Sequence, residues 1–143
     1  KIVNIIKYLV KKGIPVMGHI GLMPQTSINF KVKGKNFVQK KKILKDALAI
    51  SNSGAFAMII ECVVENLARK ITKSVSIPTI GIGASRYCDG QILVTEDMLG
   101  LSDFSPKFVK QYANLNKIME KSIKNYVKDV KMRRFPSFKN VYR

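Results

Sequence analysis

Two residues whose side chains can exchange protons each end a short apolar run. Glu61 ends the run 55–61 (AFAMIIE), and His19 ends the run 14–19 (IPVMGH). Carboxylates and imidazoles are the side chains that most often act as general acids and bases. Two other uses stay open, because a strand-end glutamate also caps a following helix or pairs with a lysine, and a buried histidine also bonds to a backbone carbonyl. Position alone therefore indicates acid–base chemistry without deciding it.

The elements that must position these residues alternate along the chain. Four segments have the apolar spacing of helices, namely 2–12, 37–53, 65–73 and 106–132. Four apolar runs are typical of buried strands, namely 14–19, 55–61, 77–83 and 91–95. Apolar strands separated by helices indicate a parallel sheet covered on both faces. The patterns predict one α/β domain over residues 1–143, either a doubly wound sheet or a piece of a barrel.

Polar or glycine-rich stretches follow three successive predicted strands. His19, Glu61 and the segment Gly81–Ser85 (GIGAS) occupy these places, which is where barrel enzymes carry their catalytic groups. GIGAS lacks the lysine and the spacing of a phosphate loop, so we interpret its glycines as a tight turn close to a ligand. Asp89 and Asp97 each stand alone in a turn-like context, and we expect them to form turns rather than bind a metal.

The charge of the chain restricts its partners. The net charge is +17, but only five of the 26 basic residues are Arg, and the Lys residues are spread along the whole chain. Proteins that read nucleic acids favour Arg for bidentate contacts and interleave aromatic residues with the basic ones. We therefore interpret the charge as a solvated surface, and a nucleic-acid-binding module remains an alternative.

The apolar and cysteine patterns restrict the cellular setting. No apolar run approaches the roughly 20 residues that a membrane span needs, so we expect a soluble protein without a membrane partner. Cys62 and Cys88 have no CxxC spacing and form no familiar zinc pattern with His19, which is the single histidine. We expect free buried thiols in a reducing cytoplasm.

Six strings along the chain identify a family resemblance. They are MGHIGLMPQ (17–25), KVKGK (31–35), IIECV (59–63), IPTIGIGAS (77–85), CDGQILV (88–94) and PKFVKQY (106–112). Their order and spacing resemble the ketopantoate hydroxymethyltransferases over nearly the whole chain. The resemblance implies the C-terminal half of a (β/α)8 TIM barrel, with about four parallel strands and with the N-terminal half of the barrel absent. It also implies a decameric, cytoplasmic enzyme of pantothenate synthesis. Such an enzyme uses Mg²⁺ and methylene-tetrahydrofolate to hydroxymethylate α-ketoisovalerate, giving ketopantoate.

The same resemblance implies roles for two residues. Glu61, in the ECV string, corresponds to the general base that removes the proton next to the keto group. His19, in the GHIGL string, corresponds to a supporting histidine near the substrate. The metal ligands of the family lie in the absent half, so no residue of this chain is assigned to the metal.

We expect the isolated chain to have little or no activity, because the half of the site that binds the metal is missing. Three alternatives to an active transferase stay open. A non-enzymatic half-barrel that needs a partner is one alternative, and a basic nucleic-acid-binding module is another. The third is a related enolate-forming enzyme that acts on a different keto acid.

Overall fold

The computed structural model describes residues 2–24 and 31–142. Gln25, which ends the first of the six strings, lies outside them. The chain divides into two compact units, Lys1–Ile92 and Leu93–Arg143, and each is described by itself.

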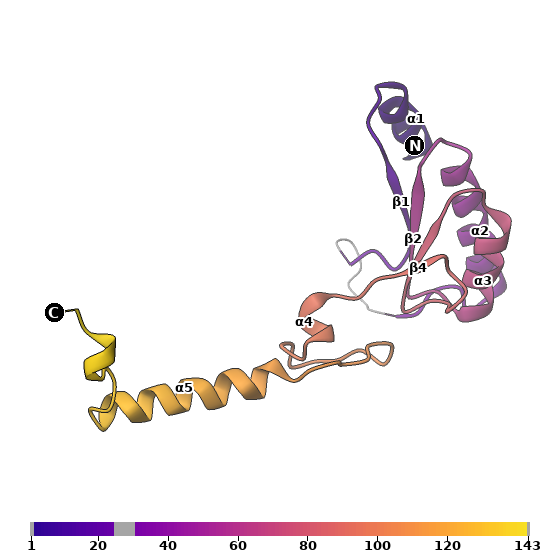
Figure 1. Ribbon diagram of the computed structural model, residues 1–143. Helices are drawn as coiled ribbons and strands as arrows, with labels where there is room; N and C mark the ends of the chain where they lie inside the picture. The colour runs from indigo at the N-terminus through magenta and orange to yellow at the C-terminus, as the bar shows by residue number, and fades with distance from the viewer. Residues whose placement is uncertain (1, 25–30, 143) are drawn as a thin grey trace. The chain divides into compact units, whose positions relative to one another are not determined.

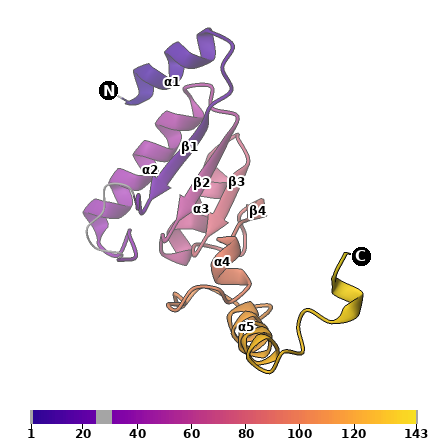
Figure 2. The ribbon, with the colours of Figure 1, turned by 90° about the vertical axis from the view of Figure 1, so that its left-hand side faces the viewer.

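The first unit is built on a parallel sheet of four strands. These are β1 (Met17–Gly21), β2 (Ala57–Glu61), β3 (Thr79–Ile82) and β4 (Gly90–Gln91), hydrogen-bonded in the order β1-β2-β3-β4. The helices of the unit are α1 (Ile2–Lys11), α2 (Phe37–Ser51) and α3 (Glu65–Ser74). Figure 1 shows α2 and α3 on the same face of the sheet, and the view in Figure 2 agrees.

The strand order decides between the two predicted architectures. A doubly wound sheet reverses its strand order at a switch point and carries helices on both faces. Here each strand lies beside the next one in the chain, and the connecting helices cover one face, as in a barrel whose crossovers all have the same hand. The α/β class and half of a (β/α)8 TIM barrel are thus confirmed. Among the described residues, β1 and β4 each pair with a strand on one side only.

The core lies between the sheet and its helices. Met58 and Ile60 of β2 are fully buried and pack with Ala68 and Ile71 of α3 in one apolar cluster. Side chains alternate between the two faces of a strand, so Ile59 lies on the opposite, open face, and it is only partly buried. The helix-covered face therefore supplies the packing of this unit.

Two strand predictions were wrong at their ends. The strand expected at 14–19 runs instead through Met17–Gly21, because its last residues pair in register with β2; His19 therefore lies inside the strand, not at its end. The strand expected at 91–95 is reduced to Gly90–Gln91. Its last ladder contact is the bond from the Ile92 N–H to the Gly81 carbonyl, 3.0 Å, after which the chain leaves the sheet.

The second unit contains α4 (Thr95–Met98), α5 (Leu115–Lys131) and a 3₁₀ turn (Phe138–Asn140). The helix predicted from residue 106 begins at residue 115, because Asn114 caps it by accepting the Lys117 N–H at 3.2 Å. Phe108 and Tyr112, which lie within the helix predicted at 106–132, therefore precede the observed helix. No residue of α5 is buried, so the apolar side chains of the helix form no core within its own unit.

Among residues 2–24 and 31–142, no helix combines the length and the apolar character needed to cross a bilayer.

Candidate active site

Glu61, at the carboxyl end of β2, meets His19, which lies two residues before the end of β1. Glu61 is the last residue of β2 and is opposite Gly21 in the register, while His19 is opposite Ile59. The longer reach of the imidazole brings Nε2 of His19 to 3.2 Å from Oε2 of Glu61. The side chains are 29% and 15% exposed, so the pair is sheltered but open to a ligand. The structure thus brings together the two residues that the sequence singled out.

The hydrogen bonds of His19 determine which ring nitrogen carries the proton. Nε2 lies 2.9 Å from the carbonyl oxygen of Leu22, and a carbonyl oxygen only accepts. Nε2 must therefore be the donor to Leu22, and the same nitrogen lies 3.2 Å from Oε2 of Glu61. This arrangement holds one oxygen of the Glu61 carboxylate and leaves its other oxygen available for a substrate proton.

The backbone around Glu61 is held from both neighbouring strands. The Glu61 carbonyl accepts the Leu22 N–H at 2.9 Å, and the Cys62 N–H donates to the Ile82 carbonyl at 2.9 Å. The Cys62 carbonyl in turn accepts the Lys33 N–H at 2.8 Å. These bonds fix the direction in which the Glu61 side chain leaves the strand.

Cys62 adopts a backbone conformation that is unfavourable for its side chain. Its φ is +49°, in the left-handed region, which costs an L-residue about 1–2 kcal/mol. Such strain persists only where the surroundings over-determine it, and it clusters at functional sites. Nothing in the sequence around Cys62 signalled this conformation, because cysteine is not a residue that usually adopts it.

Gly21 allows the two strand ends to approach each other. Its φ is +98°, and a Cβ at this position would overlap the Glu61 carbonyl and contact Val63. Only glycine fits both requirements. The sequence marked this position through its GHIGL string, but the reason for the glycine is visible only in the fold.

Both cysteines are free and buried, as predicted. Burial, and then the negative charge of Glu61, raises the pKa of the Cys62 thiol. The thiolate is the nucleophilic form of cysteine. Cys62 therefore stays a neutral thiol beside the carboxylate and is no candidate nucleophile.

The GIGAS segment forms the turn that was predicted. Gly83 has a φ of +59°, and the buried Ser85 hydroxyl donates to Oε1 of Glu65 at 3.1 Å and accepts the Tyr87 N–H at 3.2 Å. Ser85 thereby fastens the loop after β3 to the first turn of α3. That the turn lies close to a ligand stays a prediction.

The two isolated aspartates have structural positions. Asp89 lies at the amino end of the sheet, where its Oδ2 accepts the Thr79 N–H at 2.7 Å and the Thr79 hydroxyl at 2.9 Å. These two bonds, the backbone one first, lower the pKa of the Asp89 carboxyl. Asp97 lies in α4, so its predicted turn is wrong.

The described residues do not fit a complete metal site. They contain no group of three or more His, Cys, Asp or Glu side chains that could hold an ion. Octahedral Mg²⁺ needs oxygen ligands from carboxylates, waters or substrate, and at this strand end the chain offers one carboxylate, which is already bonded to His19. The geometry therefore suits an acid–base role better than a ligand set.

A cavity of about 410 Å³ adjoins His19 on the open side of β1. It is lined by side chains of α1, β1 and α2, among them Ile2, Ile20 and Ile43. Because no described strand pairs with this side of β1, the cavity is open where a barrel would continue. Within residues 2–24 and 31–142, no strand bounds the site on that side.

Comparison with known proteins gives a consistent family. A sequence model described as ketopantoate hydroxymethyltransferase matches residues 1–138. The chain is similar to proteins named 3-methyl-2-oxobutanoate hydroxymethyltransferase from Phenylobacterium zucineum (51% identity over 99% of this chain and 52% of the relative) and Pelagibacter ubique (47%, 99% and 55%). The relative from Bartonella bacilliformis is 54% identical over 96% of this chain and 52% of its own length. The chain spans about half the length of these curated relatives.

Proposed function

The chain belongs to the ketopantoate hydroxymethyltransferase family, and on that premise we propose that it supplies the general base of a hydroxymethyl transfer to α-ketoisovalerate. The observation that carries the proposal is the 3.2 Å pair of His19 and Glu61 near the carboxyl ends of adjacent parallel strands. A carboxylate with one oxygen held and the other free is suited to remove a proton from a carbon acid.

The free oxygen of Glu61 takes the proton from the carbon next to the keto group, and the C–H electron pair becomes the enolate. Water cleaves the two carbon–nitrogen bonds of methylene-tetrahydrofolate, so that tetrahydrofolate leaves and the one-carbon unit remains at the oxidation level of formaldehyde. The enolate carbon bonds to that unit, and the proton held by Glu61 passes to the new alkoxide, giving ketopantoate. His19 is a positioning residue in this step, because its Nε2 is held 2.9 Å from the Leu22 carbonyl oxygen and lies 3.2 Å from Oε2 of Glu61, where it restricts the carboxylate.

Magnesium belongs to the proposal for the whole protein. When bound, it would chelate the keto acid and stabilise negative charge on the enolate oxygen. Because the described residues hold no metal cluster, we assign its ligands to the half of the longer relatives that this chain does not match. A cytoplasmic location and a decameric assembly belong to the same proposal.

The proton-abstraction step can be tested without folate. A chimera would join this chain to the N-terminal half of the Phenylobacterium zucineum relative. In D₂O with Mg²⁺, we expect it to exchange the C3 proton of α-ketoisovalerate, followed by nuclear magnetic resonance, and to form ketopantoate once methylene-tetrahydrofolate is added. The 143-residue chain alone is expected to do neither.

Three outcomes would contradict the proposal. The first is a chimera carrying Glu61→Gln that retains proton exchange, at the same rate as a chimera carrying the matched surface change Glu120→Gln. The second is exchange of pyruvate in preference to α-ketoisovalerate, which would favour the related enolate chemistry. The third is Mg²⁺-dependent ketopantoate formation by the chain alone, which would show that the assigned division of the site is wrong.

A further inference from the structure

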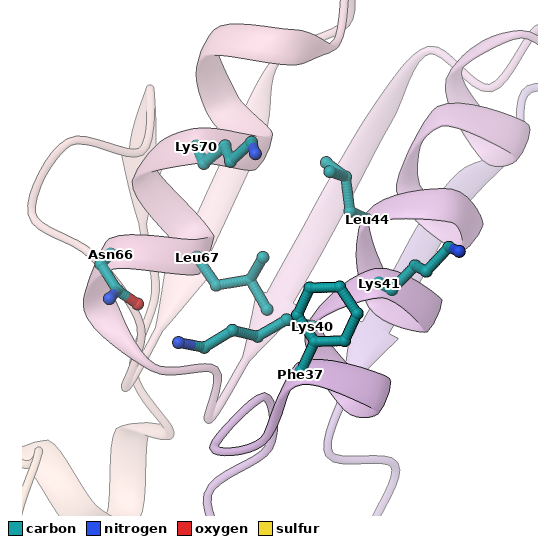
Figure 3. A pocket seen from close by; sticks show the side chains of 7 residues that line it. All are labelled: Phe37, Lys40, Lys41, Leu44, Asn66, Leu67 and Lys70. Carbon is teal, nitrogen blue, oxygen red and sulfur yellow. The ribbon is translucent and has the colours of Figure 1, made fainter.

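An open groove of about 370 Å³ lies between α2 and α3, apart from the residues of the candidate active site. The two helices contact each other and together form its walls. Figure 3 shows Leu67 of α3 pointing toward Phe37 and Lys40 of α2. The groove is therefore a feature of the helix layer, independent of the chemistry at the strand ends.

The lining of the groove contains an apolar strip. Leu67 is 4% exposed, and Leu44 beside it is partly buried, so together they form a floor. Phe37 stands at the end of this floor and is 78% exposed. A single exposed apolar residue is ordinary on a protein surface. An aromatic ring that continues a buried apolar floor into solvent is a surface onto which an apolar side chain can pack.

Three lysines surround the apolar strip. Lys40, Lys41 and Lys70 line the groove, and none of them forms an ion pair with any residue in 2–24 or 31–142. Their ammonium nitrogens stand well apart in Figure 3 and do not converge on one point. A compact anion such as phosphate is bound best by converging donors, whereas separated cations match negative charges that are spaced along an extended ligand.

We propose that the groove binds an acidic segment of another protein, in which an apolar side chain is flanked by Asp or Glu residues. The apolar side chain would pack on Phe37, Leu44 and Leu67, and the flanking carboxylates would meet the three lysines. A second copy of this chain is a poor occupant, since it has the same net charge of +17 and no run of acidic residues longer than Glu96–Asp97. Nucleic acid is disfavoured because the groove has no Arg and one aromatic ring only.

The test measures binding of labelled peptides to the 143-residue chain by fluorescence anisotropy at physiological salt. The probe is a peptide with one Leu or Phe between two pairs of Glu. One control peptide has Ser in place of the apolar residue, and a single-stranded oligouridine tests the nucleic-acid alternative. We expect the probe to bind at least ten-fold more tightly than either control.

Matched variants locate the binding site. The double change Lys41→Glu with Lys70→Glu is expected to weaken probe binding at least ten-fold. Lys45→Glu with Lys73→Glu alters the charge equally on the same two helices but outside the groove, and it should leave at least half of the affinity. Phe37→Ser is expected to weaken binding several-fold, whereas Val38→Ser, at a residue 75% exposed and outside the lining, should not. All six sites are exposed, so circular dichroism should show unchanged helix content.

The proposal would be overturned by any of three results. Equal losses in the groove pair and in the control pair would show binding by overall charge alone. Tighter binding of oligouridine than of the acidic peptide would assign the surface to nucleic acid. Absence of measurable binding of the probe at physiological salt would show that the groove has no such partner chemistry.

Discussion

The two ends of the four-stranded sheet differ in how their polar groups are satisfied. At the amino end, Thr79 is fully buried, and its hydroxyl lies 2.9 Å from both Asp89 Oδ2 and Thr72 Oγ1. At the carboxyl end, Glu61 bonds through one oxygen, is partly exposed, and precedes a residue with a strained backbone. At the amino end the polar groups bond to one another, whereas at the carboxyl end the Glu61 carboxylate keeps one oxygen that can bond to a ligand.

This difference explains how one small sheet can carry the groups that stabilise the fold at one end and the groups that react at the other. Satisfied buried hydrogen bonds stabilise the fold and leave nothing to offer a substrate. A half-satisfied carboxylate held by strained backbone contributes less to stability but is oriented for reaction. Barrel enzymes as a class carry function at the carboxyl ends of their strands and stability at the amino ends. The predictions below test that separation in this chain.

The largest effect is expected for Glu61→Gln in the chimera described above. Removing the base should lower the rate of α-ketoisovalerate proton exchange about 10³-fold, within the range typical of lost general-base catalysis. Because the amide keeps the shape of the side chain, we expect the denaturant midpoint to change little. A large fall in stability with modest loss of exchange would contradict the separation.

His19→Leu should lower the exchange rate of the chimera about 30-fold, which corresponds to about 2 kcal/mol of transition-state stabilisation. The cause is loss of the Nε2–H that orients Glu61. His19→Gln can place an N–H donor near the same point and should recover part of the rate. If Gln and Leu variants are equally impaired, with the same pH profile, orientation of the carboxylate is not the role of His19.

At the opposite end, Thr79→Val should reduce the free energy of unfolding by about 1–3 kcal/mol, the usual result of removing a buried hydrogen-bonding partner. The two side chains are similar in shape, so packing changes little. Urea denaturation of the chimera gives the free energy. Proton exchange by the folded chimera should remain near normal, and a specific loss of exchange would contradict the assignment of this end to stability.

Cys62→Val should destabilise the chimera by about 1 kcal/mol more than Cys88→Val, since a β-branched side chain is poorly tolerated at a positive φ. Both cysteines are buried, and Cys62 has the positive φ. Thermal unfolding of the two variants gives the comparison. An equal loss in both would show that burial alone, without backbone strain, determines the effect.

The smallest effect is expected for Asp89→Asn and depends on pH. The bonds from Thr79 lower the pKa of Asp89 in the folded state, so its stabilisation is present above the unfolded pKa and is lost as pH falls through the folded pKa. Near neutral pH the variant should lose about 1 kcal/mol or less, because the carboxylate is exposed. At pH 2 the free energies of unfolding of wild type and variant should converge. A difference between them that stays constant at all pH values would argue against a charge effect.

Periodicity in the sequence predicted most of the elements but not their ends. Helices α2 and α3 were expected within a few residues because their apolar positions recur at helical spacing and are buried by the neighbouring sheet. The start of α5 was missed, since residues 106–114 continue the apolar pattern and only the cap at Asn114 ends it. The length of β4 was missed because a strand exists only where a neighbour supplies hydrogen bonds.

The candidate site was predicted in part. Glu61 and His19 were identified from their positions after apolar runs and from the strings around them. The positive φ of Cys62, the acceptor role of the Leu22 carbonyl and the bonding of Asp89 to Thr79 were not. Each of these depends on which segment lies next to which, and a local pattern does not contain that information.

By itself, the sequence determined the residue types, the alternation of helices and strands, and the six strings that place this chain in its family. Only the tertiary structure decided that the strands follow one another without reversal, and that Nε2 of His19 lies 3.2 Å from Oε2 of Glu61 across two of them. The physical reason is the register of the parallel sheet. The sheet forms through crossover connections that contain α2 and α3. Its register is fixed by backbone hydrogen bonds between segments that are far apart in the chain.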